Sequence, residues 1–451
     1  MKKKLLYSFA LVLALVLAAA AVYINSLMPI ITGYAAKNLC SNVFVSEREP
    51  ADVENTDLAF SFIKYTKNTV DFENRSVTSR FLWGKSKAVY RDGLGATLVR
   101  DVPEEVLRNA VYPDDTDPVM EKDTAAWPVG DLLPDTLIPG IDRDALAQVS
   151  DRLMKGNEYK GIPFAFVVLH GGMPVAEAYR EPYGRDTRFL SWSVAKSFTN
   201  ALVGILVREG RMDLLQPAGI EEWKDDDRSR ITLNDLLQMQ SGLKWNEDYG
   251  SRSDVNLMLF REGDMSRYAV SSPMEHPSGT HWYYSSGTAN IISSLVRNEF
   301  DSDAECYAFM RDQFFEKIGI TDAVFETDPS GDFVGSSYLY ATARDYARFG
   351  LLYLNDGVFS GERILPEGWV KYTRTPASGS GGKYGALFWL NIDGRYPSAP
   401  SDMFSCEGHD GQMIFIMPSH DIVVVVLGFS HKPDNSLDFD RLLKDILACT
   451  D

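Results

Sequence analysis

The chain has 451 residues, 45% of them hydrophobic and 24% charged, which is enough for two or three folding units with a sizeable core. Asp and Glu number 63 against 45 Lys and Arg, so the formal net charge is −18. This acidic balance disfavours nucleic acid, or any other polyanion, as a partner.

The amino terminus departs from this acidic balance. Three lysines follow Met1, and residues 5–36 then carry no charge; the first part, 5–24, has about the length that crosses a bilayer. The lysines predict a cytoplasmic amino terminus and an exported body. Residues 1–36 are therefore expected to be a membrane anchor or a signal peptide cleaved near residues 18–20, and the length of the apolar run favours the anchor. The body is extracytoplasmic in both cases, anchored or secreted.

The cysteines and histidines suggest no metal centre. An exported chain can form disulfides, and four cysteines allow three pairings between which the sequence does not choose. They form no Cys-x-x-Cys pair and the six histidines are scattered, so no metal site is predicted. The cysteines are Cys40, Cys306, Cys406 and Cys449.

Residues 37–138 are expected to form an accessory β-rich region and a linker. Short runs at 76–82 and 87–90, separated by glycine turns, predict antiparallel strands. The Pro/Asp-rich residues 113–118 are typical of a linker or a wrapping loop. No chemistry is predicted in this region.

The rest of the chain predicts a sheet built from both ends, with a helical insertion between them. Residues 139–190 and 372–451 would form the α/β half, and residues 191–371 the helical half. The expected elements are, in order, a helix over 142–154, a hairpin of strands 164–169 and 175–179 turning at Gly171-Gly172, helices over 232–243 and 339–354, strands over 386–390, 412–417 and 422–429, and a helix over 436–449.

A candidate nucleophile lies where the helical half begins. Ser193 heads an apolar helical pattern, and Lys196 follows three residues later, so both side chains lie on one face, one turn apart. Burial lowers the pKa of a lysine, and the neutral amine can then take a proton from the serine. Three other Ser-x-x-Lys sequences occur, but only Ser193 heads a long apolar helix. The structural alternative is a capping serine with a lysine that reaches solvent.

Two later segments could complete this site. Tyr284 ends an aromatic approach to a helix, and a phenol beside a lysine ammonium is expected to have a lowered pKa and to relay protons. Glycines flank His409 within residues 407–412, just before a predicted strand. An edge strand entered in this way can offer an N–H to a developing oxyanion, together with the N–H of Ser193. Taken alone, the first segment is more often a packed aromatic and the second a surface turn.

Together these segments resemble the serine β-lactamase and penicillin-binding protein superfamily, in its class C-like branch. The resemblance covers residues 140–449 and rests on order and spacing. Ser193-Val194-Ala195-Lys196 matches the first motif, and the 232–243 helix ends in the hallmark Met-x-Ser-Gly-Leu. Tyr284-Ser285-Ser286 matches the second motif, Tyr-x-Asn, in part, and His409-Asp410-Gly411 matches the His-x-Gly variant of the third.

The resemblance implies a β-lactamase/transpeptidase-like α+β fold, with an antiparallel sheet flanked by helices and a mostly helical domain. The small β-rich N-terminal subdomain would be an addition to it. It also implies that Ser193 is acylated, that Lys196 and Tyr284 share the general base and acid roles, and that either could take the serine proton. The oxyanion would lie between the N–H groups of Ser193 and Gln412. No cofactor is implied, and the partner is a small ester or amide substrate.

Two motif positions depart from the pattern of the superfamily. Ser286 stands where asparagine is usual and reaches less far toward a substrate amide. His409 replaces a lysine, and a mostly neutral histidine would hold a β-lactam carboxylate poorly. The His409 variant and Trp192, just before the serine, resemble the 6-aminohexanoate-dimer hydrolases and related esterases. Substrate-side residues would thus be Trp192, Ser286, His409, Gly411 and Gln412.

We therefore expect a serine hydrolase of small esters or linear amides. The enzymatic alternatives are a cell-wall peptidase for D-amino-acid peptides and a weak β-lactamase. Outside the enzymes, the chain could be a catalytically idle penicillin-binding or sensor module, although retention of Ser193, Lys196 and Tyr284 argues against this. The sequence does not determine the oligomeric state.

Overall fold

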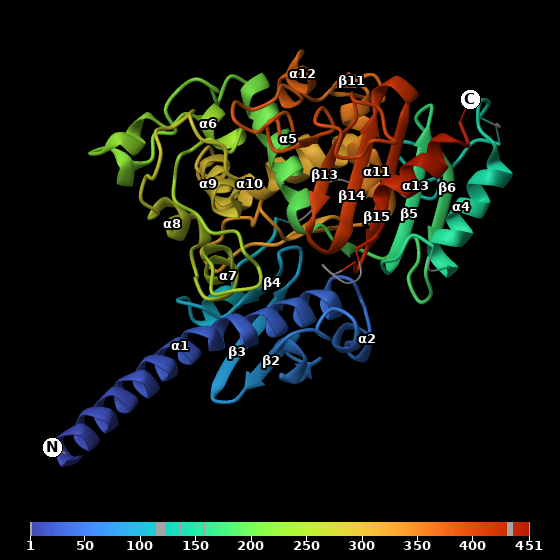
Figure 1. Cartoon of the computed structure of the whole chain (residues 1–451). Coiled ribbons are helices and arrows are strands. Elements are labelled where there is room, and N and C mark those ends of the chain that lie inside the picture. Colours follow the sequence, from blue (N-terminus) through green and yellow to red (C-terminus); the bar gives the residue numbers. More distant parts are fainter. Residues whose placement is uncertain (1, 114–121, 136–137, 157, 431–435, 451) are drawn as a thin grey trace.

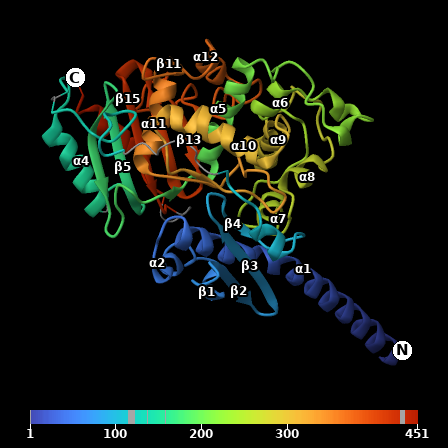
Figure 2. The same cartoon turned by 180° about the vertical axis from the view of Figure 1, so that it is seen from behind.

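A computed structural model of the chain describes residues 2–113, 122–135, 138–156, 158–430 and 436–450. Residues 114–118 of the predicted linker thus lie outside the described part. Figures 1 and 2 show a sheet with helices on both faces, a mostly helical half beside it, and an N-terminal helix that projects from the body.

The central sheet is built from segments far apart in the sequence. Its six strands are all antiparallel and follow the order β12-β13-β14-β15-β5-β6. The predicted hairpin at Gly171-Gly172 joins β5 to β6, and the other four strands come from the end of the chain. The strands are β5 (Pro163–His170), β6 (Met173–Tyr179), β12 (Trp389–Leu390), β13 (Phe404–Gly408), β14 (Gln412–Met417) and β15 (Ile422–Gly428).

Helices cover both faces of this sheet. Successive side chains of a strand point to opposite sides, so β15 contributes to one core on each face. Val423 and Val425 of β15 belong to the core shared with α11 (Ala343–Leu354). Their neighbours in β15 belong to a second core with α4 (Arg143–Lys155) and α13 (Phe439–Leu447). The apolar run of β15 is thus explained by helices on both of its faces.

Two predicted helices are shorter than the apolar pattern indicated. The pattern over 339–354 begins with β9 (Leu339–Ala341), and α11 starts only after Thr342, whose hydroxyl forms a capping box with Asp345. The pattern over 232–243 gives α6 (Leu233–Leu237), because Met239 and Gly242 adopt positive φ angles of 57° and 73°. A Cβ on Gly242 would lie 2.0 Å from the His276 carbonyl oxygen, so only glycine fits there.

The helical half contains further helices and short strands around the seam with the sheet. Its helices are α5 (Ala195–Arg208), α7 (Asp254–Phe260), α8 (Met265–Val270), α9 (Ser286–Arg297), α10 (Asp303–Met310) and α12 (Trp369–Thr373). Its short strands are β7 (Phe189–Leu190), β8 (Val324–Phe325), β10 (Val358–Phe359) and β11 (Glu362–Arg363).

The N-terminal helix α1 (Lys2–Phe44) runs without interruption through two environments. Residues 6–24 project from the body and are exposed, and an 18-residue window has a mean hydropathy of 2.4. This part is long and apolar enough to cross a membrane, which is consistent with an anchor or a signal sequence. The second part, from Met28 on, is buried in the body, so α1 continues past the predicted boundary at residue 36.

A four-stranded antiparallel meander packs against the buried part of α1. Its strands follow the order β1-β2-β3-β4, as the short runs of the sequence predicted. The elements are β1 (Lys67–Asp71), β2 (Ser76–Phe81), β3 (Gly84–Arg91) and β4 (Gly95–Leu98), with α2 (Pro50–Asn55) before them and α3 (Glu104–Arg108) after them.

A buried ion pair joins α1 to the body. The ammonium of Lys37 contacts the carboxylate of Glu326, which follows β8, and both side chains are almost fully buried. The same carboxylate accepts hydrogen bonds from the Ser41 hydroxyl at 2.8 Å and from the Ala96 N–H at 2.7 Å. The N-terminal region is therefore part of the folded core.

The four cysteines are free and buried, so none of the disulfides allowed by the sequence is formed. The described residues contain no group of three His, Cys, Asp or Glu side chains that could hold a metal ion.

Candidate active site

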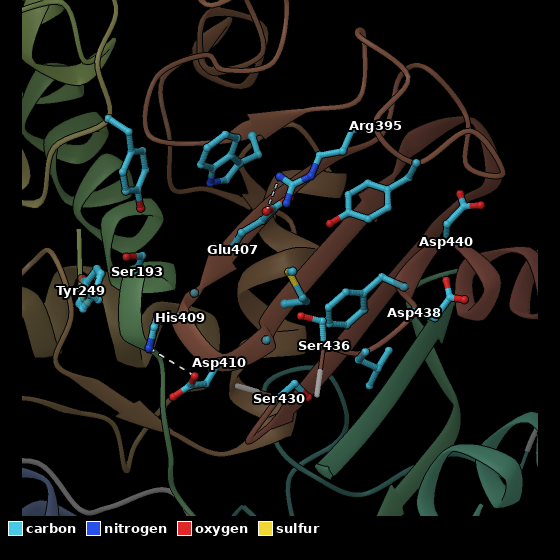
Figure 3. A pocket seen from close by; sticks show the side chains of 18 of the residues that line it. Ser193, Tyr249, Arg395, Glu407, His409, Asp410, Ser430, Ser436, Asp438 and Asp440 are labelled. Carbon is cyan, nitrogen blue, oxygen red and sulfur yellow. Dashed lines mark hydrogen bonds and ion pairs between the residues drawn. The ribbon is translucent and has the colours of Figure 1, made fainter. Parts of the chain in front are cut away.

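A cavity of about 570 Å³ lies between the sheet and the helical half (Figure 3). Ser193 and Tyr284 line it from the helical side, and Gly408 and His409 line it from the end of β13. This volume is typical of small-molecule sites. The cavity therefore brings the predicted nucleophile and two of the predicted motifs to one substrate-sized space.

Ser193 lies in a single 3₁₀ turn, Trp192–Val194, that leads directly into α5. Trp192 has a φ of +45°, a conformation that is rare and strained for a large side chain. Its indole is buried, and its packing against other rings holds the strained turn in place; these rings belong to Tyr34, Tyr249, Tyr338 and His409. Trp192 was predicted on the substrate side, but its side chain is buried in the core next to Ser193 and is outside the described lining of the cavity.

Lys196 is positioned to act on the serine hydroxyl. Its Nζ lies 2.9 Å from Ser193 Oγ, 3.0 Å from Ser286 Oγ and 2.9 Å from the carbonyl oxygen of Ser336. The side chain is fully buried, and this burial lowers the pKa of Lys196 to about 8. A substantial fraction of the amine is therefore neutral near pH 8 and able to accept the serine proton.

Tyr284 reaches the same serine from the residue before the N-cap of α9. Its ring stacks on Trp389 with 5.3 Å between centroids, and Lys196 Nζ lies 4.9 Å from the phenol ring centroid. Burial raises the pKa of Tyr284 well above its usual value, although a hydrogen bond with Ser193 opposes this shift. The lowered pKa expected from the sequence is therefore wrong, because desolvation, together with the nearby Tyr384 and Glu247, raises the pKa of this phenol. The phenol stays protonated and can donate.

Glu247 is a site residue that the sequence reasoning missed. It lines the cavity, and its carboxylate accepts hydrogen bonds from Ser286 Oγ at 2.5 Å and Ser286 N–H at 2.9 Å, and from the indole of Trp245. Ser286 therefore links this carboxylate to Lys196, which accounts for a hydroxyl where the motif usually has asparagine. Glu247 lies in an irregular loop, where no periodic pattern marks a functional residue.

Glu247→Gln is expected to move the acidic limb of the pH profile of kcat/KM to lower pH. The negative charge of Glu247 raises the pKa of Lys196 against the effect of burial. Without this charge the pKa falls below its wild-type value of about 8, so the neutral base forms at lower pH. Ester hydrolysis from pH 5 to pH 10 measures the shift, with the exposed Glu222→Gln as the control. An unchanged limb in Glu247→Gln would contradict this coupling.

The third motif lies at the turn between β13 and β14. His409 and Gly411 line the cavity, and the His409 ring stacks on Tyr249 at 4.7 Å with Asp410 Oδ1 3.3 Å from its Nε2 (Figure 3). A Cβ on Gly408 would lie 2.4 Å from the Ser191 carbonyl oxygen. Glycine therefore lets the backbone at the end of β13 approach the serine turn closely.

Gln412 lies deeper in the sheet than expected. It begins β14, and its side-chain amide exchanges two hydrogen bonds with the backbone of Gly428, at 2.6 Å and 3.1 Å. Because β14 lies between β13 and β15, the expectation of an edge strand after residue 411 is wrong. Among the described residues, Gln412 is outside the lining of the cavity.

Comparisons with known proteins agree with this architecture. A family model described as Beta-lactamase matches residues 146–447. The 6-aminohexanoate-dimer hydrolase of Paenarthrobacter ureafaciens is 27% identical over 294 residues, which cover 60% of this chain and 73% of that protein.

Solved structures share the fold at low sequence identity. EstCE1, described as a hydrolase with promiscuous acyltransferase activity, has a TM-score of 0.54 at 14% identity and covers 67% of this chain and 98% of its own. A penicillin-binding protein homolog from Caulobacter crescentus has a TM-score of 0.52 at 17% identity, with coverages of 70% and 100%. These likenesses confirm the predicted α+β fold class.

Proposed function

This chain belongs to the beta-lactamase family, and from that premise we propose that it is a serine hydrolase that forms an acyl-enzyme on Ser193. The observation that carries the proposal is the buried amine of Lys196, 2.9 Å from Ser193 Oγ at the wall of a substrate-sized cavity. A buried lysine beside a serine has little structural use, because burying a charge is costly. Its chemical use is proton transfer to and from the nucleophile.

The two proton-transfer roles follow from the opposite pKa shifts of the two groups. Lys196, with a pKa of about 8, takes the proton as Ser193 Oγ attacks the substrate carbonyl carbon. Tyr284, whose pKa is raised by burial, keeps its proton and gives it to the leaving alcohol or amine. Lys196 then returns its proton to the Tyr284 phenolate, which resets both groups. Water attacks the acyl carbon and gives a proton to Lys196, and Lys196 passes that proton to Ser193 Oγ as the acyl bond breaks.

The oxyanion of the tetrahedral intermediate would be held by two backbone N–H groups. One belongs to Ser193 and the second to Gln412. Support comes from the close approach of Gly408, which pairs with Gln412 across β13 and β14, to the carbonyl oxygen of Ser191. Backbone donors fixed in this way stabilise charge as it develops and need no reorganisation.

The charge of the cavity favours a neutral or cationic substrate. Arg395 is the arginine in the described lining, and its guanidinium is paired with Glu407 at 2.6 Å (Figure 3). A carboxylate-bearing β-lactam or D-amino-acid peptide would therefore meet net negative charge. Small uncharged esters fit better, as do linear amides of the kind cleaved by 6-aminohexanoate-dimer-hydrolase-like enzymes, because such an amide also carries an ammonium that these carboxylates can hold. The lining carboxylates are Glu247, Glu407, Asp410, Asp438 and Asp440.

The proposed place of action is outside the cytoplasm, with the body anchored to the membrane. Three lysines precede the exposed apolar part of α1, which favours a cytoplasmic amino terminus. The helix continues unbroken into the buried core, so an anchor would be joined rigidly to the body.

Labelling with a fluorophosphonate probe tests the proposed nucleophile. The full chain is expected to be labelled and the Ser193→Ala variant to remain unlabelled. Parallel assays with p-nitrophenyl esters, a 6-aminohexanoate dimer, D-alanyl peptides and nitrocefin would then rank the substrates, with the first two expected to react fastest. Absence of labelling in the wild-type chain would favour an idle binding or sensor module.

A further inference from the structure

Four large apolar side chains lie at the end of the β1–β4 sheet formed by the β2–β3 turn and the residues just before β1, where the rings of Phe62 and Phe81 are 6.2 Å apart. Phe62, Tyr65, Leu82 and Trp83 are each between 58% and 68% exposed, and we call them the apolar tip. The indole N–H of Trp83 donates to Asn25 Oδ1 at 3.1 Å. The tip is therefore level with the residue that follows the exposed apolar stretch 6–24 of α1. Figures 1 and 2 show the β1–β4 sheet on the side of the body from which α1 projects.

The turn that carries half of this tip is unusual for a hairpin. Phe81 pairs with Gly84, so Leu82 and Trp83 form a two-residue loop. Glycine or asparagine is usual at such positions, and Leu82 adopts a left-handed φ of +50°. A leucine there costs backbone strain and exposes apolar surface to water. An exposed leucine in this strained position suits contact with an apolar surface outside the chain.

A row of cations lies directly behind the tip. Lys67 is paired opposite Arg80, and Arg80 opposite Lys85, so the three side chains share one face across β1, β2 and β3. All three are exposed, and residues 76–91 contain no Asp or Glu. We call this set the basic row. An apolar edge backed by cations complements a bilayer with anionic headgroups.

The dimensions place the tip at a membrane surface. Residues 6–24 of an α-helix span about 28 Å, and the hydrocarbon core of a bilayer is about 30 Å thick. If these residues cross the membrane, Asn25 and the apolar tip reach the headgroup region together. Tryptophan and tyrosine are enriched at that depth.

We propose that the apolar tip inserts into the headgroup region of the bilayer that α1 crosses, and that the basic row contacts the lipid phosphates. The body is then held by two attachments, the helix and the tip. Because the β1–β4 sheet packs on the buried part of α1, these attachments fix the orientation of the catalytic cavity relative to the membrane. This proposal rests on the anchor and is independent of the hydrolase chemistry.

Native tryptophan fluorescence tests the proposal in the full chain. Trp83 is the most exposed of the eight tryptophans, all of which the structure describes. In nanodiscs containing anionic lipid, brominated phospholipid is expected to quench the wild-type emission, and Trp83→Phe is expected to lose most of that quenching. Leu82→Asp should weaken the quenching, whereas Leu215→Asp, a control at another exposed leucine, should leave it unchanged.

Equal quenching in the wild type and Trp83→Phe, or in the wild type and Leu82→Asp, would overturn the proposal. So would cleavage of residues 1–24 from the wild-type chain in cells, with recovery of the cleaved chain from the soluble fraction. Ester hydrolysis is expected to be the same in all these variants, since none of the changed residues lies in the cavity wall. That activity measurement separates a failure of the membrane contact from a failure of the hydrolase assignment.

Discussion

Ser193→Ala and Lys196→Met are each expected to lower kcat/KM for p-nitrophenyl esters by about 10³-fold or more, and the double variant by no more than the larger single effect. The hydroxyl and the amine are 2.9 Å apart and act as one unit, so removing either leaves the other without a function. Met preserves the length of the Lys196 side chain and removes a buried charge, so the fold should be retained. Steady-state kinetics of the three variants measure the effect.

Lys244→Met provides the matched control for this prediction. Lys244 ends another Ser-x-x-Lys sequence, Ser241 to Lys244, but its side chain is exposed. Its replacement is expected to leave kcat/KM unchanged, because the motif acts only where burial lowers the pKa of the lysine. Additive losses in the Ser193→Ala, Lys196→Met double variant would contradict the idea that the two groups act together.

The meeting of Ser193, Lys196 and Tyr284 at one place could be predicted because its signals are local or motif-like. Ser193 and Lys196 are three residues apart on one helical face, and Tyr284 precedes a clear helix start. The family resemblance that joined them is confirmed by the match over residues 146–447. The hairpin at Gly171-Gly172 and the strand at 412–417 were predictable for the same reason, since turn residues and apolar runs are short-range patterns.

What the sequence did not reveal depends on burial by distant segments. The pKa of Tyr284 rises because the fold desolvates its phenol, which proximity to Lys196 alone does not indicate. Glu247 joins the site from a loop, through a hydrogen bond to Ser286. The strand that Gln412 begins is interior and not an edge, because β13, from an earlier part of the chain, pairs with β14.

The sequence patterns also did not indicate that the N-terminal region packs against the active-site turn. Residues 1–36 were expected to be only an anchor or signal peptide, yet the end of this segment packs behind the nucleophile: the ring of Tyr34 stacks on Trp192 with 6.3 Å between centroids. Trp192 in turn precedes Ser193 in the strained turn. Helix α1 and the turn that carries Ser193 therefore share one packed core, and the stability of that core depends on how α1 packs against the body.

Lys37→Met is expected to lower the free energy of unfolding by about 3–5 kcal/mol, because it leaves the carboxylate of Glu326 buried without its cation. Lys87→Met is the matched control: its pair with Glu104 is about one-third exposed and should cost less than about 1 kcal/mol. Urea unfolding of the detergent-solubilised full chain, followed by tryptophan fluorescence, measures both. A cost for Lys37→Met no larger than that of the control would mean that α1 is held by apolar packing alone. In that case Lys37→Met should lose its activity only at the urea concentrations that also unfold the wild type.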